Sequence, residues 1–155
     1  MLGNVIWWAG YLVVAIWLQR FIPGLDALIP GFLVCLQERN RQQTATILLI
    51  SVIIQEGAGT LPFGLSLLWH GVVVALYYIG IRLFISSGSA FTLLLSFSLA
   101  LSRALFMLVM DFLQPLPMDL WTLSRVVALQ LLFTPLLWIL ARRSREKRSN
   151  NAHHR

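Results

Sequence analysis

Four charged side chains lie within or beside long apolar stretches of this chain, where a charge is costly. Glu56 closes an apolar run that begins near Thr44, and three more charges lie in later runs: Arg103, Asp111 and Arg125. A charged residue in the middle of a membrane helix costs about 2.5–3.5 kcal/mol on insertion scales, so it usually pairs, lines a cavity or binds a ligand. We therefore predict that these four side chains form a polar pocket or a surface that binds a partner.

Arg103 is the most costly of the four. It lies about ten residues, or roughly 15 Å of helix, from the end of its apolar run, which places it near the middle of a bilayer. Asp111 follows about two turns later and roughly 80° around the helix, so both side chains can face one side. Two interpretations stay open. Either helix carbonyls and a polar neighbour such as Gln55 or Gln130 satisfy the guanidinium, or Arg103 lines a cavity or binds a partner.

Asp111 and Arg125 flank a short link, Leu113 to Met118. The segments that this link joins are therefore expected to be antiparallel neighbours. An ion pair across the turn is the simplest interpretation of both charges, and a polar site open to the outer half of the membrane is the alternative.

The residue types of catalytic and metal sites do not occur here at useful spacings. His70 stands alone in its apolar segment, with no Cys, Asp or Glu at metal-ligand spacing beside it. We find no nucleophile–base pair, no HExxH motif and no phosphate-binding loop. The sequence predicts no enzyme, no cofactor and no metal site.

The composition indicates a membrane protein. Of 155 residues, 58% are hydrophobic and only 12% are charged, whereas a soluble domain has about 45–50% apolar and about 25% charged residues. So short a chain cannot bury that much apolar surface in a soluble core, so membrane lipid is the expected surrounding. The net charge of +6 does not indicate nucleic-acid binding, because no soluble basic domain carries it.

The apolar segments define the elements that must position these charges. A membrane helix needs about 20 apolar residues, and four segments meet that length: residues 4–22, 61–84, 90–113 and 119–141. Two shorter runs, 25–37 and 43–55, would each span only about 20 Å as helix. They either cross a thinned bilayer or form a re-entrant hairpin. We predict an all-α polytopic integral membrane protein with about six transmembrane helices, two of them short.

The basic residues favour six crossings. Residues 142–155 hold half of the Lys and Arg residues and are the most basic segment, so we place this end in the cytoplasm. Six crossings then put the N-terminus inside, together with Arg39, Arg41 and Arg82. A re-entrant hairpin would instead put Arg39 and Arg41 on the outer side or at depth. Asp26 falls on the outer side, where Glu56 ends the third helix and Pro62 helps to turn the chain into the next span. We predict one membrane domain, 1–141, and a disordered basic tail, 142–155.

Small residues recur at a spacing of four in two of the apolar segments. Gly71 and Ala75 form one such pair, and Ser96, Ala100 and Ala104 form a second series. This spacing lets helix backbones approach closely. Because it is common in membrane helices, we expect it to serve packing within the subunit.

The sequence resembles the MreD family of rod shape-determining proteins over about residues 20–145. The resemblance is carried by Gln55-Glu56-Gly57 through Leu61-Pro62-Phe63-Gly64-Leu65, by the helix His70–Tyr78 that follows, and by the ending from Leu120 to Arg145. In that family the acidic position is usually Asp, and Glu56 holds it here.

The resemblance implies a fold and a set of partners. It implies a six-helix subunit of the bacterial cell-wall elongation complex in the cytoplasmic membrane, similar in fold to the S-components of energy-coupling-factor transporters. Such a subunit is a non-catalytic scaffold that binds MreC, a periplasmic protein with one membrane helix, and is linked indirectly to MreB, RodA and a class B penicillin-binding protein.

An S-component-like subunit that binds a small vitamin-like solute for a transporter is the alternative. A solute pocket needs several convergent polar groups under a lid. The outer loops, 56–61 and 114–118, are short, which favours the scaffold.

Overall fold

A computed structural model describes residues 2–57, 64–83, 89–113 and 119–153. These ranges contain six α-helices and no strand, which confirms the all-α prediction: α1 (Leu2–Phe21), α2 (Leu28–Glu38), α3 (Arg41–Gly57), α4 (Leu65–Leu83), α5 (Ser89–Leu113) and α6 (Leu120–His153). The predicted turn at Pro62 and the predicted outer loop 114–118 lie outside the described residues.

Three of the described helices are long and apolar enough to cross a membrane: Leu65–Leu83, Ala90–Phe112 and Leu120–Lys147. The chain is therefore a helical membrane protein by length and composition. Helix α1 has 20 residues, among them the polar Asn4, Gln19 and Arg20, and is not among these three. Helices α2 and α3 have only 11 and 17 residues, so six crossings stay a prediction.

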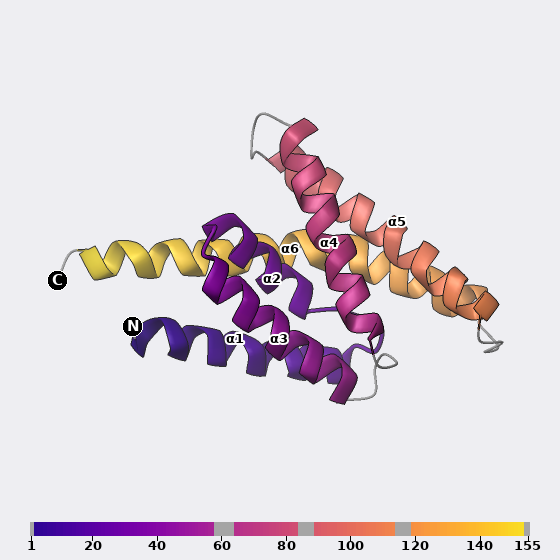
Figure 1. Cartoon of the computed structure of the whole chain (residues 1–155), viewed down its shortest axis with the longest axis horizontal. Helices are drawn as coiled ribbons and strands as arrows, with labels where there is room; N and C mark the ends of the chain where they lie inside the picture. Colours follow the sequence, from indigo (N-terminus) through magenta and orange to yellow (C-terminus); the bar gives the residue numbers. More distant parts are fainter. Residues whose placement is uncertain (1, 58–63, 84–88, 114–118, 154–155) are drawn as a thin grey trace.

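The short helix α2 forms the centre of the fold. Every residue from Leu28 to Leu36 is buried, and α2 contacts α1, α3, α4 and α6. A helix that is apolar on all sides is stable only when neighbours surround it. In Figure 1, α1 and α6 run lengthwise, whereas α4 and α5 form an antiparallel pair that is inclined across α6.

The sharp turn between α2 and α3 has a clear local cause. Helix α2 ends at Arg39, whose left-handed backbone (φ 55°) lets its N–H donate to the carbonyl of Leu36. Asn40 then caps α3, because its side-chain oxygen accepts a hydrogen bond from the backbone N–H of Gln43 at 3.3 Å.

Large apolar side chains lie on the surface as well as in the interior. Trp69, Trp138 and Phe32 are fully buried, yet one face of α5 exposes a row of large apolar side chains: Leu93, Phe97, Leu101, Leu105, Leu108 and Phe112. Water would penalise so large an exposed apolar area. Lipid does not, so this face fits the hydrocarbon of a bilayer.

Helix α6 differs from our expectation of a disordered tail after residue 141. It continues to His153, because Arg, Glu and Lys are good helix formers. Arg142 Nε also pairs with Glu146 Oε1 one turn later, at 2.7 Å. In addition, Arg145 binds Glu38 at the end of α2, with Nε 2.6 Å from Oε1. The helix therefore continues beyond the end of the apolar segment.

Gly31 provides a test of the packing around α2. A Cβ at this position would overlap the ring of Tyr11, and that ring is held by a 2.8 Å hydrogen bond from its hydroxyl to the carbonyl of Ala27. We expect Gly31→Ala to lower the free energy of unfolding by about 1–3 kcal/mol relative to Gly71→Ala. Equilibrium unfolding in mixed micelles measures both.

Gly71→Ala is a matched control, because Gly71 is also helical and its Cβ would meet nothing within 4 Å. Any gain in helix propensity is therefore common to the two variants. Equal stability of the two would contradict the close approach of α1 and α2.

Candidate functional site

A buried carboxylate joins several helices at one end of the molecule. Asp26, in the link between α1 and α2, is only 3% exposed. Gln55 Nε2 of α3 donates to both carboxylate oxygens, at 3.0 and 3.1 Å. Trp69 Nε1 of α4 donates at 3.1 Å, and Gln19 Nε2 of α1 at 3.4 Å. Three helices are therefore tied to one side chain.

Two further residues extend this network. Ser66 donates its hydroxyl to Gln55 Oε1 at 2.8 Å, and the backbone N–H of Asp26 donates to Gln130 Oε1 of α6 at 3.4 Å. We call these residues the Asp26 cluster: Gln19, Asp26, Gln55, Ser66, Trp69 and Gln130. Hydrogen bonds in a setting of low dielectric are strong when satisfied and costly when broken, so the cluster specifies how these helices meet.

Trp69 contacts opposite charges with its edge and its face. Its indole N–H donates to Asp26, while the guanidinium carbon of Arg103 lies 5.1 Å from the ring centroid. Such a cation–π contact contributes about 2 kcal/mol when it is desolvated. Among the described residues, Asp26 forms no ion pair with any Lys or Arg, so Trp69 is its structural link to a positive charge.

Arg103 keeps part of its hydrogen-bonding capacity unused. Its Nε and Nη1 atoms are buried and have no hydrogen-bond partner within the described ranges. Neither Gln55 nor Gln130, the neighbours suggested by the sequence, bonds to it. The aromatic contact with Trp69 is the interaction that the structure assigns to this guanidinium.

Glu56 connects the two ends of the link between α3 and α4. Its side chain is half-buried, and Oε1 accepts a 2.8 Å hydrogen bond from the backbone N–H of Gly64. Gly64 has a φ of 84°, a value that favours glycine. Gln55 and Glu56 thus both hold the end of α3 against the start of α4.

Asp111 and Arg125 lie on the neighbouring helices α5 and α6 but form no ion pair with each other. Asp111 is half-buried, whereas Arg125 is exposed, so the two side chains do not share a buried face. Within the described ranges, no ion pair joins any two of the four predicted residues, and their role as a pocket or partner surface stays a prediction. They line neither the cavity beside Arg39 nor the groove along α4.

Asp26 is predicted from the sequence to fall on the outer side, and no role is predicted for it. Its partners come from chain positions that are 29 and 104 residues away, Gln55 and Gln130. One feature of the sequence could have indicated this role, because Asp26 is an acidic residue within the apolar stretch PGLDALIP. A carboxylate there must either reach water or find donors.

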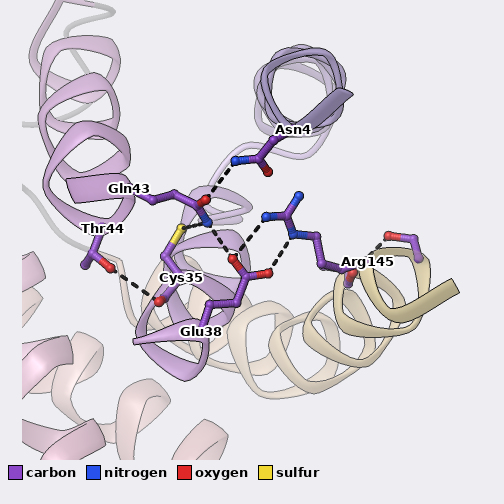
Figure 2. A network of polar contacts seen from close by, with 8 residues as sticks. Asn4, Cys35, Glu38, Gln43, Thr44 and Arg145 are labelled. Atoms are coloured by element: carbon purple, nitrogen blue, oxygen red, sulfur yellow. Dashed lines mark hydrogen bonds and ion pairs between the residues drawn. The ribbon is translucent and has the colours of Figure 1, made fainter. Parts of the chain in front are cut away.

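A second polar cluster lies at the opposite end of the fold (Figure 2). Glu38 accepts hydrogen bonds from Arg145 Nε at 2.6 Å and from Gln43 Nε2 at 2.6 Å. Gln43 also accepts from Asn4 Nδ2 at 2.9 Å. The start of α1, the α2–α3 turn and the basic part of α6 therefore meet at one end of the molecule.

Gly71 and Ala75 do not pack within the subunit as we expected. Both are exposed, because Trp69, Val73 and Tyr77 occupy the face of α4 that is buried. Together with nearby apolar side chains they line an open groove of about 520 Å³: Gly64, Leu67, Leu68, Gly71, Val72 and Ala75.

The chemistry of the Asp26 cluster is structural. Asp26 is saturated with amide and indole donors and is closed to solvent, so it has no access to a substrate. Across the described parts of the chain, no group of three His, Cys, Asp or Glu side chains is placed to hold a metal ion.

Asp26→Asn tests the cluster. The substitution replaces one acceptor oxygen with an NH2 group that faces the N–H donors of Gln55 or Trp69. We expect the free energy of unfolding to fall by about 2–3 kcal/mol, since hydrogen bonds to a charged group are among the stronger ones.

Asp111→Asn is the control for this measurement, because Asp111 is half-buried and forms no ion pair with any residue that the structure describes. We expect it to stay within about 0.5 kcal/mol of the native chain. If the two variants unfold alike, the Asp26 cluster does not hold the helices together.

The chain was compared with known protein families, curated proteins and solved structures. No protein-family model, no curated protein and no solved structure matches the chain. Its defining features are a buried carboxylate that joins helices, a basic end where α2 and α6 meet, and apolar outer faces. These describe a helical membrane protein with two polar clusters, one at each end.

Proposed function

We propose that the chain is a non-catalytic adaptor of the bacterial cell-wall elongation complex, a rod shape-determining protein of the MreD type. In this role it binds the membrane helix of MreC and is linked through it to MreB, RodA and a class B penicillin-binding protein. The family resemblance suggests these partners, and the open groove along α4 is the observation that carries the adaptor role.

The groove supports the proposal through its shape and lining. It is apolar, and nothing lies within 4 Å of a Cβ placed on Gly71. Small residues at this spacing allow the backbone of a second helix to approach closely in lipid, where packing drives association. A partner with a single membrane helix, such as MreC, is the kind of occupant that suits it.

The ends of the fold support a six-crossing topology in the bacterial cytoplasmic membrane, with both termini in the cytoplasm. The Glu38–Arg145 ion pair holds the α2–α3 turn beside the basic part of α6. Arg39 and Arg41 then share a side with the C-terminal arginines, as the positive-inside rule requires.

The use of polar side chains favours the adaptor over a solute-binding subunit. A solute site needs polar groups that converge on a cavity. Here Gln19, Gln55 and Trp69 direct their donors at Asp26 instead.

Gly71→Leu is the experiment that tests the proposed function. The new side chain would fill the groove without touching the subunit's own core, since a Cβ at this position meets nothing within 4 Å. We expect co-purification of MreC from mild detergent to fall at least about fivefold, in the range that loss of a helix–helix contact produces.

Gly10→Leu is a matched control, because Gly10 is exposed on α1 and its Cβ would also meet nothing within 4 Å. We expect this variant to retain MreC. If both variants retain MreC equally, the α4 groove is not the binding site of the partner helix. If MreC is absent from the native preparation, the proposed function is excluded.

A further inference from the structure

A cavity of about 470 Å³ lies where α2, α4, α5 and α6 meet, at the basic end of the molecule. It combines a charged rim with an apolar wall. We call its charged lining the rim, which consists of Glu38, Arg39, Arg142, Arg145 and Glu146, and its apolar lining the wall, which includes Tyr77, Ile81 and Phe91. A cavity with this division of polarity suits a ligand that has an anionic head and an apolar body.

The charges on the rim do not cancel. Arg145 is paired with Glu38 through Nε at 2.6 Å, and Arg142 is paired with Glu146 at 2.7 Å. Arg39 forms no ion pair and no side-chain hydrogen bond with any described residue. One guanidinium at the rim therefore remains to bind an anion.

The backbone of Arg39 points to a use for its side chain. Its φ of 55° lies in the left-handed region, where glycine is the least costly residue and is the usual choice just after a helix. The cap itself uses only the backbone N–H of residue 39, which bonds to the carbonyl of Leu36. Glycine would supply that bond equally well, so arginine adds only its guanidinium, and a strained residue of this kind is a pointer to function.

We infer that this cavity binds the phosphate headgroup of an anionic phospholipid. The guanidinium of Arg39 offers the planar pair of donors that matches phosphate oxygens. Basic pockets between membrane helices bind anionic headgroups at the cytoplasmic surface. Tyr77, Ile81 and Phe91 provide an apolar wall for the glycerol and the start of an acyl chain, which a free phosphate ion would not use.

This inference depends on insertion in a bilayer and not on the proposed role in cell-wall elongation. It also concerns the end of the fold opposite to the Asp26 cluster. A lipid seated here would contact α2 and α6 together, beside the Glu38–Arg145 ion pair.

Arg39→Gly gives a clear test because the variant suits the backbone while it removes the guanidinium. The full-length protein, stripped of lipid in detergent, is titrated with phosphatidylglycerol or phosphatidylcholine, and binding is read by native mass spectrometry. We expect phosphatidylglycerol to bind Arg39→Gly about tenfold more weakly than the native chain, as for loss of a charge-assisted contact. Phosphatidylcholine binding and thermal stability should not fall.

Arg39→Gln and Arg143→Gln form a matched pair of charge removals, since Arg143 is exposed on α6 and does not line the cavity. We expect only Arg39→Gln to weaken phosphatidylglycerol binding. Equal losses in the two variants would indicate diffuse attraction and overturn the site. Undiminished binding by Arg39→Gly would do the same, and displacement of the lipid by inorganic phosphate at equal concentration would overturn the lipid assignment.

Discussion

The buried carboxylate of Asp26 sets the constraint on which this helical arrangement depends. An acid that is removed from water must be given donors, and the chain supplies them from α1, α3 and α4. Each donor can reach Asp26 only if its helix is correctly placed and rotated. In lipid, where apolar contacts alone choose weakly among helix pairings, such a polar cluster gives directional specificity.

The two polar clusters hold the helices together at opposite ends of the bundle. The Asp26 cluster fixes one end, and the contacts among Glu38, Gln43 and Arg145 fix the other. Between them, α2 contributes an apolar centre that four helices cover. The outward faces of α4 and α5 are thereby left uncovered by the subunit, and the groove around Gly71 lies on that of α4.

Much of the helical layout could be predicted from sequence, because apolar runs bounded by polar or turn residues mark helices directly. The run predicted at 90–113 appears as α5, Ser89–Leu113, and the short run at 43–55 lies within α3, Arg41–Gly57. The end of α6 was not predicted, because the apolar pattern marks only the part of a helix that lies in lipid. The charged residues beyond Ala141 are good helix formers, so the helix continues through them.

The site was harder to predict than the helices for a physical reason. Pairing among buried polar groups depends on helix rotation and on contacts between distant parts of the chain. Glu56 was recognised as a residue of the link, but its bond to the backbone of Gly64 could not be foreseen. Asp111 and Arg125 were near in sequence, yet the rotation of α6 turns Arg125 outward.

The buried position of α2 has a consequence for biogenesis. Helix α2 contacts α6, so one of its walls is supplied by a helix that is synthesised long after it. Until then, Glu38 lacks Arg145 and the backbone of Asp26 lacks Gln130. A nascent chain must therefore hold a short, incompletely covered helix in the membrane until α6 has been made, and the arrival of α6 then closes the bundle around it.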